Sequence, residues 1–91
     1  MGNADNALKF RNAEIFRQKL AEKKLGPPQF YQALAAYVKR TCPDSASQQV
    51  TLSNNLHKEL NRVKISDKVL LQGLAILEFS NEEIAAILAT R

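Results

Sequence analysis

Few side chains in this sequence could perform nucleophilic or metal chemistry. There is one histidine, His57, and one cysteine, Cys42. Zinc sites need several histidine, cysteine or carboxylate ligands that converge on one ion, so the common zinc patterns are excluded. A Cys42–His57 nucleophile pair would need a third group to orient the histidine, and the sequence offers none. We therefore expect His57 to be a surface residue beside Lys58 and Glu59.

Carboxylates and glycines also argue against catalysis. Glu82 and Glu83 follow Ser80, so Ser80 can cap a helix while Glu83 reaches back to the Ser80 amide in a capping box. Negative charge is favourable in the first turn of a helix, which accounts for both glutamates. No glycine-rich phosphate loop is present, because the three glycines stand apart in the chain. We expect no enzymatic activity, no cofactor and no small-molecule substrate.

Length and composition favour a single small domain. The 91 residues, 45% of them hydrophobic, fit one domain over residues 1–91, with residues 1–5 flexible. One cysteine cannot form an intrachain disulfide, which fits a reducing compartment. No apolar run approaches the roughly 18 residues that a membrane span needs. We expect an intracellular, cytoplasmic protein, nuclear if it is eukaryotic, that does not enter membranes.

Apolar spacing predicts an all-α, compact bundle of about five short helices. Their expected positions are residues 5–24, 28–41, 48–63, 67–78 and 81–90. Gly26-Pro27-Pro28 separates the first two, because glycine suits the residue just past a helix end and proline cannot continue that helix. Cys42-Pro43 ends the second, since the residue before a proline is disfavoured in a helix. Residues 51–55 could instead form a loop that caps a shorter third helix.

The same spacing predicts the core. The helix over 67–78 has the broadest apolar face and is expected to be the most buried, with Gly73 allowing a neighbouring helix to approach. Phe79 before the Ser80 cap and Ile84 after it have the spacing of a hydrophobic staple, and Ile65 and Leu70 repeat it one helix earlier. Other expected core residues are Phe30, Leu34, Tyr37, Val38, Leu52, Leu56, Leu60, Val63, Val69, Leu71, Leu74, Ile76 and Leu77.

The segment Leu74–Arg91, LAILEFSNEEIAAILATR, resembles the entry half of helix-turn-helix domains through its Ser-x-Glu-Glu-Ile-Ala-x-Ile-Leu run. The resemblance implies that residues 81–90 form the scaffold helix. Because the sequence ends at Arg91, we expect no recognition helix that would read the major groove. The same stretch is similar to the opening of ubiquitin-associated domains through Leu-x-x-x-Glu-Phe-Ser, with Glu78 where that family has glycine. Neither resemblance assigns a functional residue.

Charge and exposed aromatics indicate where a partner would bind. The net charge is +4, and residues 1–40 carry eight basic and three acidic residues against five and six in residues 41–91. An anionic partner would prefer the N-terminal half, although such charge can equally serve solubility. Phe10 and Tyr31 fall off the main apolar stripes, as interface anchors do, unless another helix covers them.

From these features we expect a non-enzymatic regulatory or adaptor domain that binds another protein or a second copy of itself. The alternative is a nucleic-acid-binding transcriptional regulator that uses its basic N-terminal half. The residues expected to contact the partner are Phe10, Arg11, Arg17, Lys23, Lys24, Tyr31, Lys39 and Arg40.

Overall fold

The computed structural model describes the backbone of residues 2–91 and the side chains of residues 6–91. This part of the chain contains no strand and five helices, so the predicted all-α bundle is confirmed. The helices are α1 (Gly2–Glu22), α2 (Pro27–Thr41), α3 (Ala46–Leu60), α4 (Asp67–Ile76) and α5 (Asn81–Ala89). Met1 and the side chains of residues 2–5, in the segment expected to be flexible, lie outside the described residues.

The turn between α1 and α2 differs from its prediction. Lys24, not Gly26, adopts the left-handed conformation that ends α1, with φ of 55°. Its amide donates to the Ala21 carbonyl at 3.0 Å, which satisfies one of the free carbonyls at the helix end. Gly26 instead precedes α2 as its N-cap with extended backbone, φ −76°, and Pro27 opens the helix.

Helix α3 includes residues 51–55, so the loop alternative for this stretch is wrong. The helix ends at Leu60 rather than residue 63, where Asn61 Nδ2 donates to the His57 carbonyl at 2.7 Å. Val63 was expected in the core but is 68% exposed in the loop that follows. Ile65, at 1% exposure, is the loop residue that covers the core, because the chain has turned by this point.

Serine caps begin the last two helices as predicted. Ser66 Oγ accepts from the Val69 amide at 3.3 Å, and both partners of the Ser80–Glu83 capping box are formed. Phe79 is partly buried and Ile84 is 8% exposed, so both belong to the apolar interior that the staple spacing predicts.

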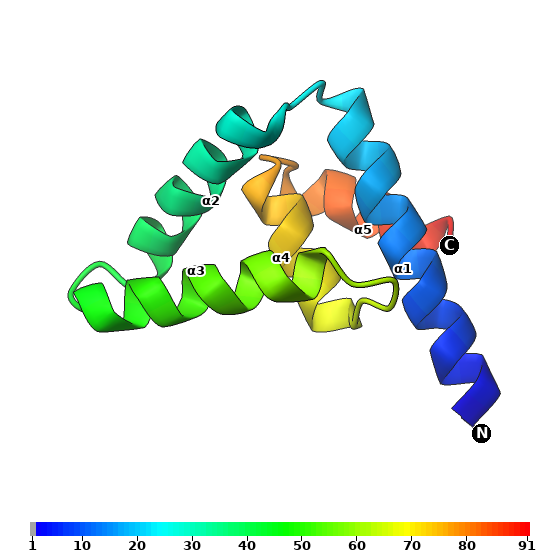
Figure 1. Cartoon of the computed structure of the whole chain (residues 1–91). Coiled ribbons are helices and arrows are strands. Elements are labelled where there is room, and N and C mark those ends of the chain that lie inside the picture. Colours follow the sequence, from blue (N-terminus) through cyan, green and yellow to red (C-terminus); the bar gives the residue numbers. More distant parts are fainter. Residues whose placement is uncertain (1) are drawn as a thin grey trace.

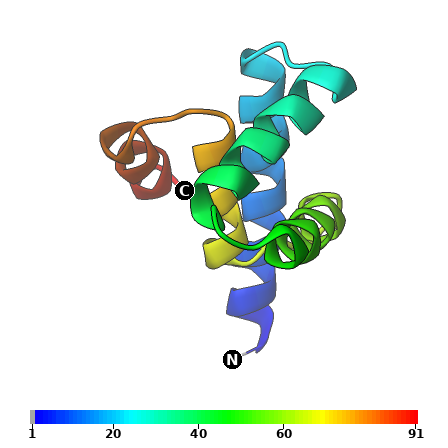
Figure 2. The ribbon, with the colours of Figure 1, turned by 90° about the vertical axis from the view of Figure 1, so that its left-hand side faces the viewer.

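Helix α4 lies at the centre of the fold and contacts each of the other four helices. In Figure 1, α1, α2 and α3 trace a triangle around it, and Figure 2 shows α3 and α5 on opposite sides of α4. Gly73 permits this packing: a β-carbon there would lie 2.8 Å from Leu60 Cδ2 and 2.9 Å from the Phe16 ring. The predicted close approach at Gly73 is therefore confirmed.

The core gathers around α4, which confirms its predicted burial. Leu71 is the exception on that helix, because it points outward at 42% exposure. Phe30, Tyr37, Leu52 and Val69 pack against the core while partly buried. The buried apolar residues are Ala13, Ile15, Phe16, Leu34, Val38, Leu56, Leu60, Ile65, Leu70, Leu74, Ile76, Leu77 and Ile84.

Candidate functional site

Phe10 and Tyr31, the two aromatics proposed as interface anchors, are both largely accessible. Phe10 is 44% exposed and Tyr31 is 50% exposed, so neither is covered by another helix of the bundle. They occupy different surfaces. Phe10 lies in the N-terminal half of α1, whereas Tyr31 lies near the start of α2 and lines a groove with Phe16 and Leu20 from the C-terminal half of α1. The structure thus separates them into two candidate sites.

Three of the predicted partner-binding cations have partners within the bundle. The Arg11 guanidinium pairs with Glu14 at 3.2 Å. Arg17 Nη2 donates to the Arg62 carbonyl at 2.9 Å, and the Lys23 ammonium lies 4.4 Å from the centre of the Phe79 ring. These contacts give the three cations a role within the bundle that does not require a ligand.

The remaining predicted cations do not form one surface. Lys24 is exposed at the turn between α1 and α2. Lys39 and Arg40 are exposed in the last turn of α2, at the corner where α2 meets α3 in Figure 1. The basic N-terminal half predicted as a binding region is therefore distributed along two helices.

An apolar groove with a volume of about 200 Å³ opens beside Tyr31, and we call it the Tyr31 groove. It lies where α1, α2 and α3 approach one another. Its lining includes an aromatic series: the Phe16 and Phe30 rings meet edge to face with centroids 6.1 Å apart, and the Tyr31 ring centroid lies 6.2 Å from that of Phe30. The lining residues are Phe16, Leu20, Leu25, Gly26, Pro27, Phe30, Tyr31, His57, Leu60 and Asn61.

His57 forms one wall of the Tyr31 groove. It is exposed, as predicted, and its ring centroid lies 5.3 Å from that of Tyr31. The sequence did not reveal this contact, because 26 positions separate the two residues and they belong to different helices. Contact with the imidazole restricts the Tyr31 side chain, so a partner would lose little conformational entropy at this anchor.

Exposed lysines adjoin the lining of the Tyr31 groove in sequence. Lys24 is next to Leu25 of the lining, and Lys58 is next to His57. None of the described residues that line the groove is acidic. An apolar ligand with negative charge at its flanks would complement these lysines.

A second surface lies where the α3–α4 loop crosses α1, and we call it the basic loop patch: Lys9, Phe10, Arg62, Val63 and Lys64. The Lys64 ammonium lies 5.3 Å from the Phe10 ring centre. A surface hollow of about 420 Å³ is lined by Lys9, Arg62, Val63 and Lys64 together with Glu59 and Ser66. Of the five patch residues, only Phe10 is among the predicted partner contacts, because the other four are brought together by the tertiary contact between the loop and α1.

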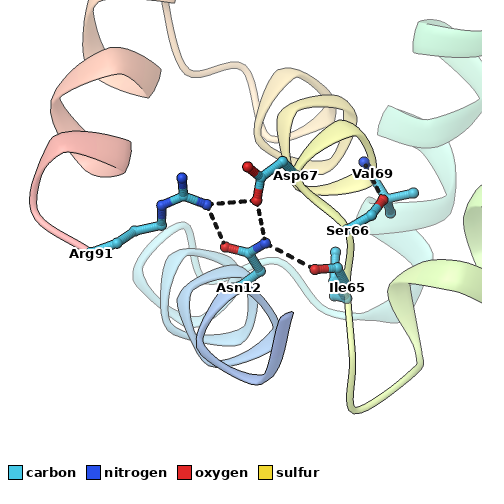
Figure 3. A network of polar contacts seen from close by, with 6 residues as sticks. All are labelled: Asn12, Ile65, Ser66, Asp67, Val69 and Arg91. Carbon is cyan, nitrogen blue, oxygen red and sulfur yellow. Dashed lines mark hydrogen bonds and ion pairs between the residues drawn. The ribbon is translucent and has the colours of Figure 1, made fainter. Parts of the chain in front are cut away.

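A polar network centred on the buried Asn12 joins α1, the exposed Asp67 at the start of α4 and the end of the chain (Figure 3). Asn12 has 0% exposure, and its Nδ2 donates to the Ile65 carbonyl at 2.9 Å and to Asp67 Oδ1 at 2.8 Å. Arg91 Nη1 donates to Asn12 Oδ1 at 2.9 Å and to Asp67 Oδ1 at 2.7 Å. These hydrogen bonds, Arg91 first and Asn12 second, lower the pKa of Asp67.

The residues first considered for catalysis do not converge. Cys42 lies beside the first turns of α3, where its carbonyl accepts from Gln49 Nε2 at 2.8 Å, whereas His57 lies in the last turn of that helix. Among the described residues, no three His, Cys, Asp or Glu side chains form a group that could hold a metal ion. Glu83 serves the capping box, and the hydrogen bond from the Ser80 amide is the main reason that the pKa of Glu83 is lowered.

No family model, curated protein or solved structure matches this chain. Across residues 2–91, every helix is too short or too polar to cross a membrane. The segment that resembles helix-turn-helix and ubiquitin-associated domains forms the end of α4, the loop and α5. Glu78, at the position of the glycine in the second family, has a φ of 67°.

Proposed function

We propose that this domain is a non-enzymatic regulatory or adaptor module that binds another protein through the Tyr31 groove. The observation that carries the proposal is the position of Tyr31, half exposed beside His57 at the mouth of an apolar groove. Tyrosine anchors that border a desolvated pocket commonly dominate the energy of protein interfaces. A tyrosine offers a partner a large apolar ring together with a hydroxyl that can form a hydrogen bond.

The groove favours one kind of occupant, a short acidic amphipathic helix. Its volume of about 200 Å³ suits one or two large apolar side chains rather than a whole ligand molecule. Helices present such side chains at positions i, i+3, i+4 and i+7, and their flanking positions can carry glutamates toward Lys24 and Lys58. These lysines therefore favour an acidic segment over a basic one.

The test uses a labelled synthetic helix with leucines at positions i, i+4 and i+7 and glutamates at its flanks. The matched control peptide carries lysines in place of the glutamates. Titration of the whole chain, followed by amide chemical shifts, should move the resonances of Tyr31, His57 and Asn61 most. Tyr31→Ala should weaken binding by about ten-fold or more, the scale of losing an interface anchor. Val50→Ala, at 60% exposure on another surface, should bind like wild type.

Other results would contradict this assignment. Equal binding of the lysine peptide would remove the charge argument, and shifts concentrated away from the groove would move the site. Sedimentation equilibrium of the free chain addresses a second copy as the occupant. Self-association that is abolished by Tyr31→Ala would assign the groove to a homodimer instead of an acidic partner.

A further inference from the structure

We propose that the basic loop patch is a second binding site, for single-stranded nucleic acid, which it holds through phosphate contacts and base stacking on Phe10. The patch shares no residue with the lining of the Tyr31 groove. Its residues come from α1 and from the α3–α4 loop, which are far apart in sequence. Such a surface is created by the tertiary structure and differs from the N-terminal basic half that composition alone indicates.

The fold holds the loop firmly against α1. The Ile65 amide donates to the Lys9 carbonyl at 3.0 Å, and Arg17 Nη2 donates to the Arg62 carbonyl at 2.9 Å. Between these two attachments, Val63 and Lys64 project from a backbone that is fixed at both ends. The patch is therefore preorganised, and little backbone entropy is lost when a ligand binds.

Positive charge dominates the hollow beside Phe10. Lys9, Arg62 and Lys64 line it with a single carboxylate, Glu59, which is engaged by the Arg62 guanidinium at 3.1 Å. The lining thus keeps a net charge of +2 from three cations and one anion. Backbone phosphates bind such a surface by releasing counterions, without reading the base sequence.

Phe10 adds a surface on which a base can stack. Phe10 is 44% exposed, whereas a phenylalanine that belonged to the core would be buried. The Lys64 ammonium lies over the ring at 5.3 Å, a weak contact at an exposed site. A stacking base would displace this ammonium onto the adjacent phosphate, replacing a cation–π contact with a charge pair. Paired bases are already stacked within a duplex, so the patch favours single strands.

Fluorescence anisotropy with a short labelled single-stranded oligonucleotide of mixed sequence, and a duplex of the same length, tests the proposal. The double variant Lys9→Gln, Lys64→Gln should weaken single-strand binding by about ten-fold. It should also reduce the slope of the logarithm of the binding constant against the logarithm of salt concentration by about 1.4, the value for two lost phosphate contacts. The control, Lys39→Gln with Arg40→Gln, removes the same charge from the exposed end of α2 and should leave the affinity nearly unchanged. Circular dichroism melts of each variant verify that the fold is retained.

Phe10→Leu separates stacking from general electrostatics. This variant keeps an apolar side chain and all positive charge, so it should weaken single-strand binding about five-fold or more while leaving duplex binding unchanged. Absence of single-strand binding by wild type, or equal losses in the two charge variants, would overturn the proposal. So would an effect of the patch variants on the acidic peptide but not on the oligonucleotide, which would assign the patch to the protein partner.

Discussion

Arg91 Nη1 lies 2.7 Å from Asp67 Oδ1, and this ion pair joins the last residue of the sequence to the first residue of α4. Asn12 on α1 bonds to both members of the pair, which closes a triangle of hydrogen bonds (Figure 3). Because Asn12 is fully buried, its amide cannot exchange these partners for water. The triangle therefore couples the position of α1 to those of α4 and the segment after α5.

Removing the Asn12 amide should destabilise the fold substantially. Asn12→Ala leaves the Ile65 carbonyl and the Asp67–Arg91 pair without their shared partner, at a cost of about 2–3 kcal/mol. Asn6→Ala is the matched control, since Asn6 is an exposed asparagine on the same helix and should change stability by less than about 0.5 kcal/mol. Urea denaturation measures both. Equal midpoints for the two variants would show that the hydrogen bonds of Asn12 contribute no stability.

The lowered pKa of Asp67 should make the fold acid-sensitive. The folded chain holds the Asp67 proton less tightly than the unfolded chain, so this stabilisation is present above the unfolded pKa and disappears as pH falls through the folded pKa. Urea midpoints of wild type should therefore drop as the pH falls from about 5 toward 2, a range that begins just above the ordinary aspartate pKa. Asp67→Asn should flatten this drop at the cost of stability near neutral pH. An unchanged pH profile in the variant would exclude Asp67 as a source of the effect.

Gly73 should resist even a methyl group. Alanine would raise the intrinsic helix propensity of α4 by about 1 kcal/mol. Its β-carbon, however, would lie 2.9 Å from the buried Phe16 ring and 2.8 Å from Leu60 Cδ2, and overpacking of this kind costs about 1–3 kcal/mol. We expect Gly73→Ala to lower the thermal midpoint, whereas Gln72→Ala, at the neighbouring and partly exposed position, should leave it nearly unchanged. A stabilised Gly73→Ala would mean that α1 and α3 can move away from α4 without loss of packing energy.

Local signals accounted for most of the fold. The serine caps and the Phe79–Ile84 spacing depend on residues within about one turn of one another, so the sequence was sufficient to predict them. The prediction that Val63 is a core residue was wrong. Its spacing from Leu60 suits a helix, but the chain turns after Leu60, and contacts with α1 stabilise that turn. Spacing carries no information on such contacts.

The candidate sites are formed by contacts between residues that are far apart in the sequence. The Asn12–Ile65 hydrogen bond spans 53 positions, and Lys64 reaches Phe10 across a similar separation. Sequence alone singled out Phe10 and Tyr31 by their places off the apolar stripes but left open whether another helix covers them. It could not pair Tyr31 with His57 or Phe10 with Lys64, because the crossing of helices determines both pairs.

Glu78 should be more stable as glycine. Its φ of 67° follows from the turn that ends α4, in which the Phe79 amide donates to the Leu74 carbonyl at 3.2 Å. This left-handed conformation costs a side chain about 1–2 kcal/mol, partly offset by the greater flexibility of glycine in the unfolded chain. Glu78→Gly should therefore gain about 0.5–1 kcal/mol in a urea melt. Glu78→Ala removes the same charge but keeps the strain, so it should gain nothing. Equal gains would trace the effect to charge.

The start of α5 should show which of its two local signals matters more. Ser80→Ala removes the cap that accepts from the Glu83 amide at 3.1 Å and should cost about 1 kcal/mol. Phe79→Ala should cost about 2–4 kcal/mol, because it leaves a cavity against the core and removes the ring beneath the Lys23 ammonium. Ser80→Asp keeps an oxygen acceptor and should remain close to wild type. Urea melts rank the three variants. A Phe79→Ala midpoint equal to that of wild type would show that α5 is not packed to the core through this ring, and would leave Phe79 as a surface aromatic available to a partner.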